Sequence, residues 1–341
     1  MLLQSPIAPM EALSVDAIPE GPEWQYEPKW DGFRCLVFRD GDTVTLQSKA
    51  GKPLTRYFPD VVAAVRALKA KQFVLDSEIA VPHNGAFSFD ALLQRIHPAQ
   101  SRIEKLAAET PALLIAFDLL EDERGKSLLE KPLSDRRPKL EAFAAKNLSR
   151  GVDVRLSPAT TKLAEAKGWL TKVGSTLDGI IAKRRDAPYA PGTRDAMVKV
   201  KNYRSADCVV GGFRYGTNGQ LIGSLLLGLH DDNGLLHHVG FTSSIARADK
   251  PSLTAKVEKL KGGPGFTGNA PGGASRWSTE RSAEWVPLKP QLVAEVCYDH
   301  FSGERFRHGT RLLRWRPDKA PAQCTMDQVK QRRADLMRLL K

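Results

Sequence analysis

The first 200 residues alternate between short apolar runs and segments with helical spacing of apolar positions. The short runs predict strands at 35–39, 43–48, 73–81, 113–120, 178–183 and 197–201. Gly41 and Asp42 form a tight turn between the first two, which predicts a hairpin. Helical spacing predicts a helix at 58–70 and another at 92–106 with a break at Pro98. We therefore expect a mixed, antiparallel α+β fold. Polar residues fall at the ends of its strands, where functional sites are usually built.

From residue 207 the pattern changes to short apolar runs separated by glycine-bearing turns. These runs lie at 208–210, 225–227, 238–241 and 292–296. Short strands at regular intervals predict a small β-barrel. A chain of 341 residues exceeds the usual size of one domain, so we expect two, with the boundary near 201–206. The predicted domains are residues 1–202 and 203–341.

The charge balance is strongly basic. The chain holds 51 Lys and Arg against 39 Asp and Glu, a net charge of +12, and its pI is near 9.5. Residues 1–202 hold 30 basic and 26 acidic side chains, a net +4, so the shorter remainder contributes +8. A polyanionic partner such as nucleic acid is expected, with its contacts mainly in the C-terminal part. The alternative is a solvated charged face that keeps the protein in solution.

Cysteine usage and hydropathy exclude several classes of protein. Cys35, Cys208, Cys297 and Cys324 are far apart and form no CxxC pair, so neither a zinc ribbon nor a disulfide framework is indicated. The N-terminus has no basic segment followed by a long apolar run, and no stretch approaches the roughly 18 apolar residues of a membrane helix. We therefore expect a soluble protein of the cytosol.

Lys29 is the strongest candidate for chemistry. A lysine amine attacks only when deprotonated, and its usual pKa lies well above neutral, so it must lie near cations or away from water. Arg34 follows closely, and Lys199 and Lys201 occupy alternate positions of a predicted strand, so both face the same side. Such a cluster could lower the pKa of Lys29 and hold a triphosphate. Taken alone, the segment is equally compatible with an exposed turn, because Asp31 and the glycine after it are ordinary turn residues.

The segment Glu27-Pro28-Lys29-Trp30-Asp31-Gly32 resembles the first motif of the ATP-dependent DNA ligases, which are covalent nucleotidyltransferases. The resemblance implies an antiparallel-sheet adenylation domain followed by a C-terminal OB-fold β-barrel. It also implies that Lys29 attacks the α-phosphate of ATP and carries AMP, that Glu27 contacts adenine, and that Arg34 reaches the ribose or a phosphate.

Three further segments resemble the next motifs of the family. In residues 48–52 a lysine, Lys49, stands where arginine is usual, which removes bidentate phosphate binding there; Lys49 and Lys52 are expected to contact DNA. Asp76-Ser77-Glu78 has Ser77 in place of glycine, and its Glu78 is expected to bind the ribose or a metal-linked water. Phe117-Asp118 matches the element whose ring stacks on adenine, although Phe117 alone fits a core strand better.

The remaining motifs follow in order. Residues 178–183 resemble the fourth motif with Asp178 in place of glutamate, so a carboxylate remains for a divalent cation, Mg²⁺ or Mn²⁺, and Lys183 would balance phosphate charge. Lys199 and Lys201 match the fifth motif, with Met197 replacing tryptophan. Residues 305–319 resemble the sixth motif, with Gly309 where proline is common. Its side chains Arg314, Arg316, Asp318 and Lys319 would be presented to ATP. Alone, this last segment is typical of a generic basic nucleic-acid patch.

The resemblance implies sealing of nicked duplex DNA in three steps through lysyl-AMP and 5′-adenylylated DNA. Segments 26–34, 56–59 and 316–319 resemble most the bacterial ligase C branch, which favours a role in repair. We expect no helical DNA-binding domain before Lys29 and a monomeric enzyme. The alternatives are an RNA ligase or an mRNA-capping-type nucleotidyltransferase, and a non-catalytic nucleic-acid-binding scaffold.

Overall fold

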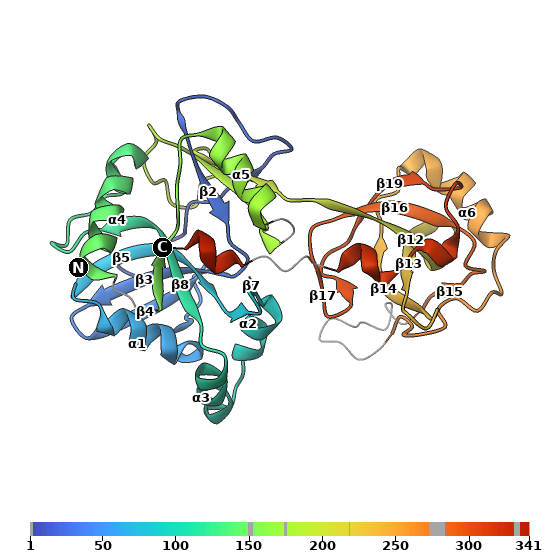
Figure 1. Cartoon of the computed structure of the whole chain (residues 1–341), viewed down its shortest axis with the longest axis horizontal. Helices are drawn as coiled ribbons and strands as arrows, with labels where there is room; N and C mark the ends of the chain where they lie inside the picture. Colours follow the sequence, from blue (N-terminus) through green and yellow to red (C-terminus); the bar gives the residue numbers. More distant parts are fainter. Residues whose placement is uncertain are drawn as a thin grey trace. The chain divides into compact units, whose positions relative to one another are not determined.

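The computed structural model describes residues 3–148, 153–173, 176–217, 219–272, 284–330 and 335–340. The chain forms two compact units, Met1–Asn202 with Arg332–Lys341, and Tyr203–Gln331. Figure 1 shows both ends of the chain in the first unit. The outer limits of the predicted domains, Met1 and Lys341, lie outside the described residues.

The end of the chain packs on the first unit and not on the second, into which the sequence-based division had placed it. The short 3₁₀ helix η6 (Leu336–Leu339) begins where the amide of Leu336 donates a hydrogen bond to the carbonyl of Gly85, at 2.7 Å. Leu336 is buried in a cluster with Tyr26 and Trp169. Apolar burial holds this segment on the first unit. The sequence did not predict this position, because so few residues carry no periodic pattern that indicates where they pack.

A five-stranded sheet forms the centre of the first unit, in the order β4-β3-β5-β8-β9. Its strands are β3 (Phe33–Asp40), β4 (Thr43–Ser48), β5 (Gln72–Ala80), β8 (Leu113–Glu121) and β9 (Val154–Leu156). All neighbours are antiparallel except β8 and β9. The hairpin of β3 and β4 and the strands β5 and β8 confirm the strand predictions to within two residues. Every residue of β8 is buried, which its uninterrupted apolar run indicates.

Helices pack on this sheet or on one another beside it (Figure 1). They are α1 (Pro59–Ala67), α2 (Phe89–Arg95), α3 (Gln100–Glu109) and α4 (Leu133–Asn147), with the 3₁₀ helix η1 (Thr55–Tyr57) before α1. The break predicted at Pro98 separates α2 from α3. Val61 and Val65 of α1 share one apolar core with Phe73 of β5, and the ring of Phe143 of α4 lies 4.9 Å from that of Phe73.

A second, four-stranded sheet carries the candidate nucleophile. Its order is β1-β11-β10-β2, with β1 (Leu13–Ser14), β2 (Trp24–Lys29), β10 (Gly179–Arg184) and β11 (Met197–Lys201). The helix α5 (Leu163–Val173) buries Trp169 against this sheet, in the cluster that includes Ile180. The small hairpin of β6 (Pro82–His83) and β7 (Ala86–Phe87) follows β5. The predicted strands at 178–183 and 197–201 are confirmed as β10 and β11.

Helix α4 was not predicted, and its charged residues explain why. Pro138 lies inside the helix, and Arg136 and Arg137 occupy buried positions that an apolar stripe would normally fill. The guanidinium of Arg136 donates two hydrogen bonds of 3.0 Å to the carboxylate of Asp118 on β8. The two side chains are only 1% and 2% exposed. A buried charge is tolerated when it is paired and hydrogen-bonded, so the ion pair takes the place of apolar packing here.

The second unit contains an antiparallel sheet in the order β14-β13-β12-β16-β19, with β15 also paired to β12. The strands are β12 (Arg204–Tyr215), β13 (Ile222–His230), β14 (Leu236–Thr242), β15 (Val286–Pro287), β16 (Val293–Tyr298) and β19 (Arg311–Trp315). A small hairpin joins β17 (Phe301–Ser302) and β18 (Arg305–Phe306). The predicted strands all exist, but β12 and β13 are much longer than their apolar runs.

The described residues of the second unit also form a helix and three short 3₁₀ helices. They are α6 (Lys250–Glu258), η3 (Arg247–Asp249), η4 (Pro321–Gln323) and η5 (Met326–Val329). The core gathers Val209, Leu227, Val296 and, from α6, Val257. Over the described parts of both units, no helix is long and apolar enough to cross a membrane.

Breaking the buried pair of α4 and β8 tests its role in the fold. We expect Arg136→Met to lower the free energy of unfolding by about 3 kcal/mol, because it leaves the Asp118 carboxylate buried without its partner. Arg184→Met is the matched control, since Arg184 pairs with Asp186 at the surface and both side chains are exposed. Urea titration of both variants measures the difference. Equal losses would show that burial of the pair is unimportant.

Candidate active site

A pocket in the first unit brings together residues from both of its sheets. It encloses about 710 Å³ of empty space out to its open mouth. The N-terminal segment Pro9–Ala12 forms part of its wall. Its lining includes most of the site residues predicted for the adenylation domain, namely Glu27, Lys29, Arg34, Lys49, Glu78, Phe117, Lys183 and Lys199. Residues almost 190 positions apart in the sequence thus share one cavity.

The last residue of β2, Lys29, presents its amine to the pocket. Strand register sets Gly179 of β10 opposite Lys29 on one side and opposite Lys201 of β11 on the other. The Nζ of Lys29 forms an ion pair with a carboxylate oxygen of Asp178. Burial lowers the pKa of Lys29, the nearby Lys201 and Lys199 lower it further, and Glu78 and Asp31 act in the opposite direction. A lowered pKa is what a nucleophilic lysine needs at neutral pH.

Glu78 lies on β5, opposite Arg34 of β3. Burial raises the pKa of Glu78 to about 7, against the effects of Arg34 and Lys29, which lower it. The chain between Lys29 and Arg34 runs close to this strand. A Cβ at Gly32 would lie 2.2 Å from the carbonyl oxygen of Ile79, so only glycine permits this approach. Gly32 therefore holds Glu78 and Lys29 near each other.

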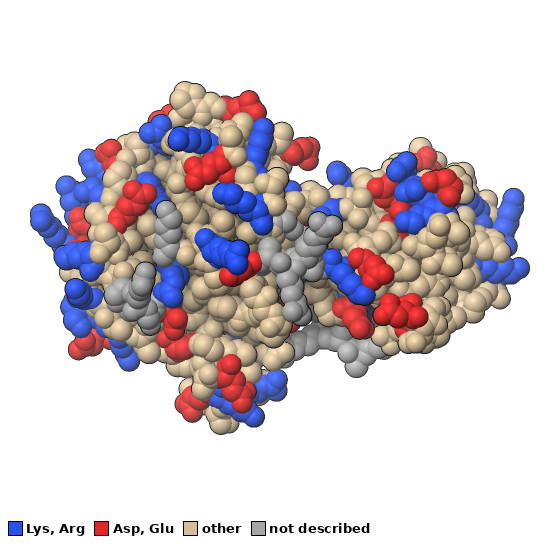
Figure 2. Space-filling model, viewed as in Figure 1, with Lys and Arg blue, Asp and Glu red and all other residues tan. Residues whose placement is uncertain are grey.

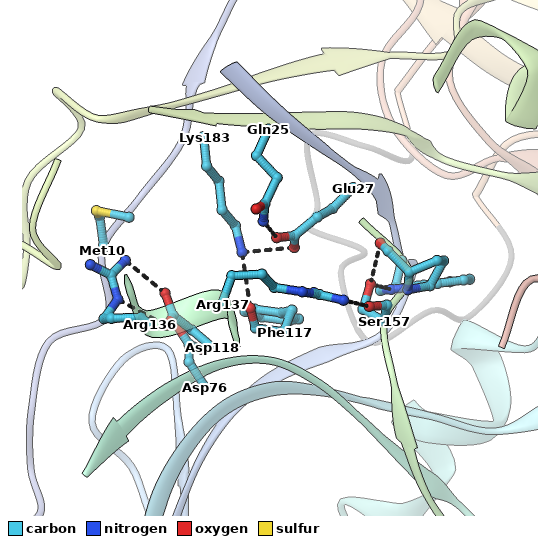
Figure 3. Close-up of polar contacts among 12 residues, drawn as sticks. Met10, Gln25, Glu27, Asp76, Phe117, Asp118, Arg136, Arg137, Ser157 and Lys183 are labelled. Carbon is cyan, nitrogen blue, oxygen red and sulfur yellow. Dashed lines mark hydrogen bonds and ion pairs between the residues drawn. The ribbon is translucent and has the colours of Figure 1, made fainter. Parts of the chain in front are cut away.

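A buried polar group surrounds the ring of Phe117 (Figure 3). The Nζ of Lys183 donates to Glu27 Oε2 at 2.7 Å and to the carbonyl of Phe117 at 3.3 Å. Gln25 donates to the other oxygen of Glu27, at 2.9 Å. The cations of Lys183 and Arg34 lie 4.7 and 4.8 Å from the centre of the Phe117 ring. Because Lys183 is bound to Glu27 deep in the pocket, it orients that carboxylate.

Hydrogen bonds to Asp76 and to the backbone of Met10 hold the guanidinium of Arg34 in place. Its Nε and Nη2 donate to the two oxygens of the buried Asp76, at 2.6 and 2.5 Å. The hydroxyl of Tyr189 donates to the same carboxylate at 2.6 Å, and Arg34 also donates to the carbonyl of Met10 at 3.2 Å. Asp76 was seen in the sequence only as part of a motif, and Tyr189 was not identified at all. No local pattern marks either residue as a partner of Arg34.

The cationic wall of the pocket combines Lys49 and Lys199. Burial lowers the pKa of Lys199, and neighbouring positive charges, Lys49 first, lower it further. The Nζ of Lys49 lies 3.1 Å from the carboxylate of Glu11, a residue that the sequence did not single out. Lys52, the other residue predicted to contact DNA, is exposed and does not line the pocket.

The predicted residues of the sixth motif lie on the second unit, in two groups. Arg316 donates to Asp207 at 2.9 Å and to Asp318 at 2.7 Å. Lys319 donates to the same Asp207 at 2.7 Å. Arg314, by contrast, pairs with Glu295, at 2.6 Å. The hydrogen bond from Arg316 lowers the pKa of Asp318 to about 2, so this group stays charged over the whole physiological range.

Of the carboxylates near Lys29, Glu78 and Asp178 are those that the sequence predicts for a divalent cation. Among the described residues, no group of three or more His, Cys, Asp or Glu side chains could hold a metal by itself. Mg²⁺ normally binds through one or two carboxylates together with substrate phosphates and water. Glu78 and Asp178 fit that pattern, whereas they do not make a cage of protein ligands.

Comparison with known proteins decides the family. The model of the ATP dependent DNA ligase domain matches residues 9–201, and that of the ATP dependent DNA ligase C terminal region matches residues 218–319. The chain belongs to the ATP-dependent DNA ligases. DNA ligase C1 of Mycolicibacterium smegmatis is 45% identical over 96% of this ligase and 94% of its own length. DNA ligase C of Mycobacterium tuberculosis is 41% identical over 95% and 94%.

These relatives place the ligase in the bacterial ligase C branch and confirm the resemblance found in its motifs. The fold is that of the family, an antiparallel-sheet nucleotidyltransferase domain followed by a C-terminal OB-like domain. A solved structure of Lig E DNA ligases has the same fold, with a TM-score of 0.55 at 14% identity, and the match covers 90% of this chain and 99% of that one. The ligase uses ATP and acts on DNA, as its family does.

The titration of Glu78 gives a test of the site's electrostatics. Its pKa is higher in the folded protein than the usual 4.5, so its contribution to stability is complete below pH 4.5 and is lost as the pH rises through 7. Relative to Glu78→Gln, the wild type should lose about 3 kcal/mol of unfolding free energy between pH 4.5 and 8. Denaturant titrations of both proteins across this range measure it. A difference that does not change with pH would contradict the assignment.

Proposed function

We propose that the protein seals nicks in duplex DNA and that Lys29 is the residue that carries AMP. The observation that supports this most strongly is the position of the Lys29 amine. It lies in the pocket with a lowered pKa, beside Glu78 and close to Lys199 and Lys201. An amine whose pKa is lowered loses its proton more readily, and the cations beside it can stabilise phosphate charge.

The proposed reaction begins when the Lys29 Nζ attacks the α-phosphorus of ATP. An N–P bond forms, the bond from the α-phosphorus to the bridging oxygen breaks, pyrophosphate leaves, and the amine loses a proton. An oxygen of the 5′-phosphate at the nick then attacks the AMP phosphorus and releases the amine. Finally, the adjacent 3′-hydroxyl attacks the 5′-phosphate, closes the strand and releases AMP. Alignment and charge stabilisation supply most of the catalysis in such transfers.

Adenine recognition is assigned to the buried group around Phe117. The Phe117 ring offers a face for stacking, and the Glu27 carboxylate offers an acceptor held in one orientation by Lys183. Arg34, anchored by Asp76, is placed toward the ribose or a phosphate. We propose Lys199 and Lys201 for the phosphates. Lys183 binds ATP only indirectly, because its charge is already engaged with Glu27.

Glu78 and Asp178 are the proposed ligands of Mg²⁺, or of Mn²⁺ in its place. The ion would neutralise phosphate charge and polarise the phosphoryl group. The pair of Asp178 with Lys29 holds the amine and this carboxylate at one end of the pocket. The substitution of aspartate for glutamate at residue 178 shortens the reach by about one methylene, so we expect weaker metal binding than in a glutamate variant.

We propose residues 1–202 as the adenylation domain and residues 203–341, apart from the last segment, as the OB domain that binds DNA. Arg314, Arg316 and Lys319 are assigned to the pyrophosphate of ATP, and Lys49 and Lys52 to DNA phosphates. The net charge of +8 on residues 203–341 supports binding of this region to the phosphate backbone of DNA. Figure 2 shows blue and red side chains interspersed on both units, so on that face no patch of a single sign stands out.

A role in repair is also proposed. A multifunctional non-homologous end joining DNA repair protein, LigD of Mycobacterium tuberculosis, is 31% identical over 88% of this chain, which spans 37% of that relative. The ligase would act in the cytosol as a monomer. An RNA ligase or capping-type activity is the competing function, and it differs in nucleotide or nucleic-acid substrate.

Labelling with nucleotide tests the proposal. We expect ATP, but not GTP, to add one AMP mass to the wild type at Lys29, and the protein to seal a singly nicked DNA duplex. Lys29→Arg should lose both activities, because a guanidinium keeps the charge but is not a nucleophile at this pH. Lys162→Arg, a change at an exposed lysine, is the control and should keep both. Intact-protein mass spectra and gel assays give the readout. An AMP adduct on Lys29→Arg would refute the assignment.

A further inference from the structure

Gln25 is a buried residue of β2 that the reaction derived above does not use. It lies two residues before Glu27, so the two side chains project from the same face of the strand. In the pairing of β2 with β10, Gln25 lies opposite Lys183, and both side chains turn toward the Glu27 carboxylate (Figure 3). Glu27 and Lys183 line the pocket, whereas Gln25 is not among the described residues that line it. We therefore expect Gln25 to act on a nucleotide only through Glu27.

The carboxylate of Glu27 has one donor on each of its oxygens. Gln25 Nε2 donates to Oε1 at 2.9 Å, and Lys183 Nζ donates to Oε2 at 2.7 Å. None of the three residues is more than 6% exposed, so water competes little for these bonds. The terminal torsion of a glutamate is soft and does not by itself fix the plane of the carboxylate. Two donors on separate oxygens fix that plane, whereas Lys183 alone would let the carboxylate turn about a single contact.

Purine bases differ in the group at C6 that a side chain can read. Adenine carries an amino group there, which donates, whereas guanine and hypoxanthine carry an oxygen, which accepts. A carboxylate only accepts. If it is fixed against C6, it bonds adenine but leaves two acceptors facing each other when the base is a 6-oxo purine. A carboxylate that can turn moves away from O6, or admits a water molecule that donates to both oxygens.

We propose that Gln25 determines the preference of the pocket for adenine over 6-oxo purines by fixing the carboxylate of Glu27. This inference rests on the proposed function, which assigns the base to Glu27 and Phe117. Gln25 is a positioning residue, because it contacts Glu27 and not the base. A neutral amide suits this position, since it holds one oxygen without placing a second positive charge beside Lys183.

Equilibrium binding of three nucleotides tests the proposal. They are ATP, inosine triphosphate and purine ribonucleoside triphosphate, which carries only a hydrogen at C6. Gln25→Met removes the donor but keeps most of the side-chain volume. With EDTA present to prevent transfer, we expect the preference for ATP over inosine triphosphate to fall about tenfold, while the affinity for the third nucleotide changes by less than about twofold. Calorimetric titrations give the dissociation constants. An unchanged preference, with or without a loss common to all three nucleotides, would overturn the proposal.

A second variant and a matched control accompany this measurement. Gln25→Asn keeps a buried amide but draws it back by a methylene, so its preference for ATP should fall as in Gln25→Met. Gln47 is another buried glutamine of the first unit, and its side chain bonds the backbone of Ile7 and not Glu27. In Gln47→Met, any loss should fall equally on ATP and inosine triphosphate. Full preference in Gln25→Asn, or a tenfold fall in Gln47→Met, would contradict the role of Gln25.

A double variant tests whether the effect passes through Glu27. In a Glu27→Gln background, adding Gln25→Met should leave the preference between ATP and inosine triphosphate unchanged, because the group that Gln25 positions is already altered. A further fall of about tenfold would show that Gln25 acts on the base directly, against the proposal.

Labelling with Mg²⁺ present separates this inference from the proposed function. A wild type that takes up no AMP on Lys29 would refute the proposed reaction but leave the binding ratios intact. A wild type that takes up AMP, together with an unchanged preference in Gln25→Met, would refute only the role of Gln25.

Discussion

Gly179 lies between Lys29 and Lys201 in one row of the four-stranded sheet, and the nucleotide pocket depends on that row. Its φ is +154°, and a Cβ there would lie 2.0 Å from the carbonyl oxygen of Val200. Any side chain at this position would push β11 away from β10. Because side chains alternate along strands, the same register also brings Lys199, Ile181 and Glu27 into line two residues away. A single close backbone contact therefore sets the relative positions of Lys29, Lys199, Lys201 and Glu27.

The charged residues proposed to bind substrate are paired with one another. Arg34 is bound to Asp76, Glu27 to Lys183 and Lys29 to Asp178. Buried pairs such as the first two are held for orientation, because desolvation offsets much of their attraction. The pairs of Glu11 with Lys49 and Arg194, at the pocket edge, are more exposed. Exposed pairs contribute little stability, so the buried pairs matter most for the geometry of the pocket.

The residues of the second unit that are proposed to bind ATP are also paired with carboxylates. Arg316 and Lys319 both bind Asp207, which lies on β12 close to the start of the unit. An ATP phosphate that engages these cations must compete with one partly buried carboxylate. We infer that Asp207 keeps the two side chains extended in one direction, at a modest cost in phosphate affinity. Arg314 is paired separately, with Glu295, and its side chain is 64% exposed.

Local pattern was enough to predict much of the fold. Uninterrupted apolar runs identified β5 and β8, because strands covered on both faces need no polar positions. The apolar pattern did not predict α4, because Arg136 occupies a buried position that an apolar residue normally fills. Its ion pair with Asp118 makes that burial possible. The pattern also failed for the last segment, whose partner around Gly85 lies 250 residues away. Long-range pairing of this kind leaves no periodic trace in sequence.

The candidate site was predictable to a similar extent. Lys29, Glu78, Phe117 and Lys199 were found through the order of the ligase motifs, and they line one pocket. Glu11, which lines the pocket, and Tyr189, which binds Asp76, were missed because their hydrogen-bond partners lie far away in the chain. Lys183 was also found, and the structure adds that its amine pairs with Glu27, a contact that follows from the pairing of β10 with β2 and that no motif indicates. Motifs identify chemical groups, whereas strand register decides what each group contacts.

The central claim is that AMP passes through Lys29 to the end of a DNA strand. The most direct measurement uses ATP labelled at the α-phosphate and a nicked duplex whose 3′-end lacks its hydroxyl, so that sealing stops before the last step. The label should appear first on the protein and then, in equal amount, on the 5′-phosphate of the nick as adenylylated DNA. Label that stays on the protein, or that reaches DNA without first appearing on Lys29, would contradict this account.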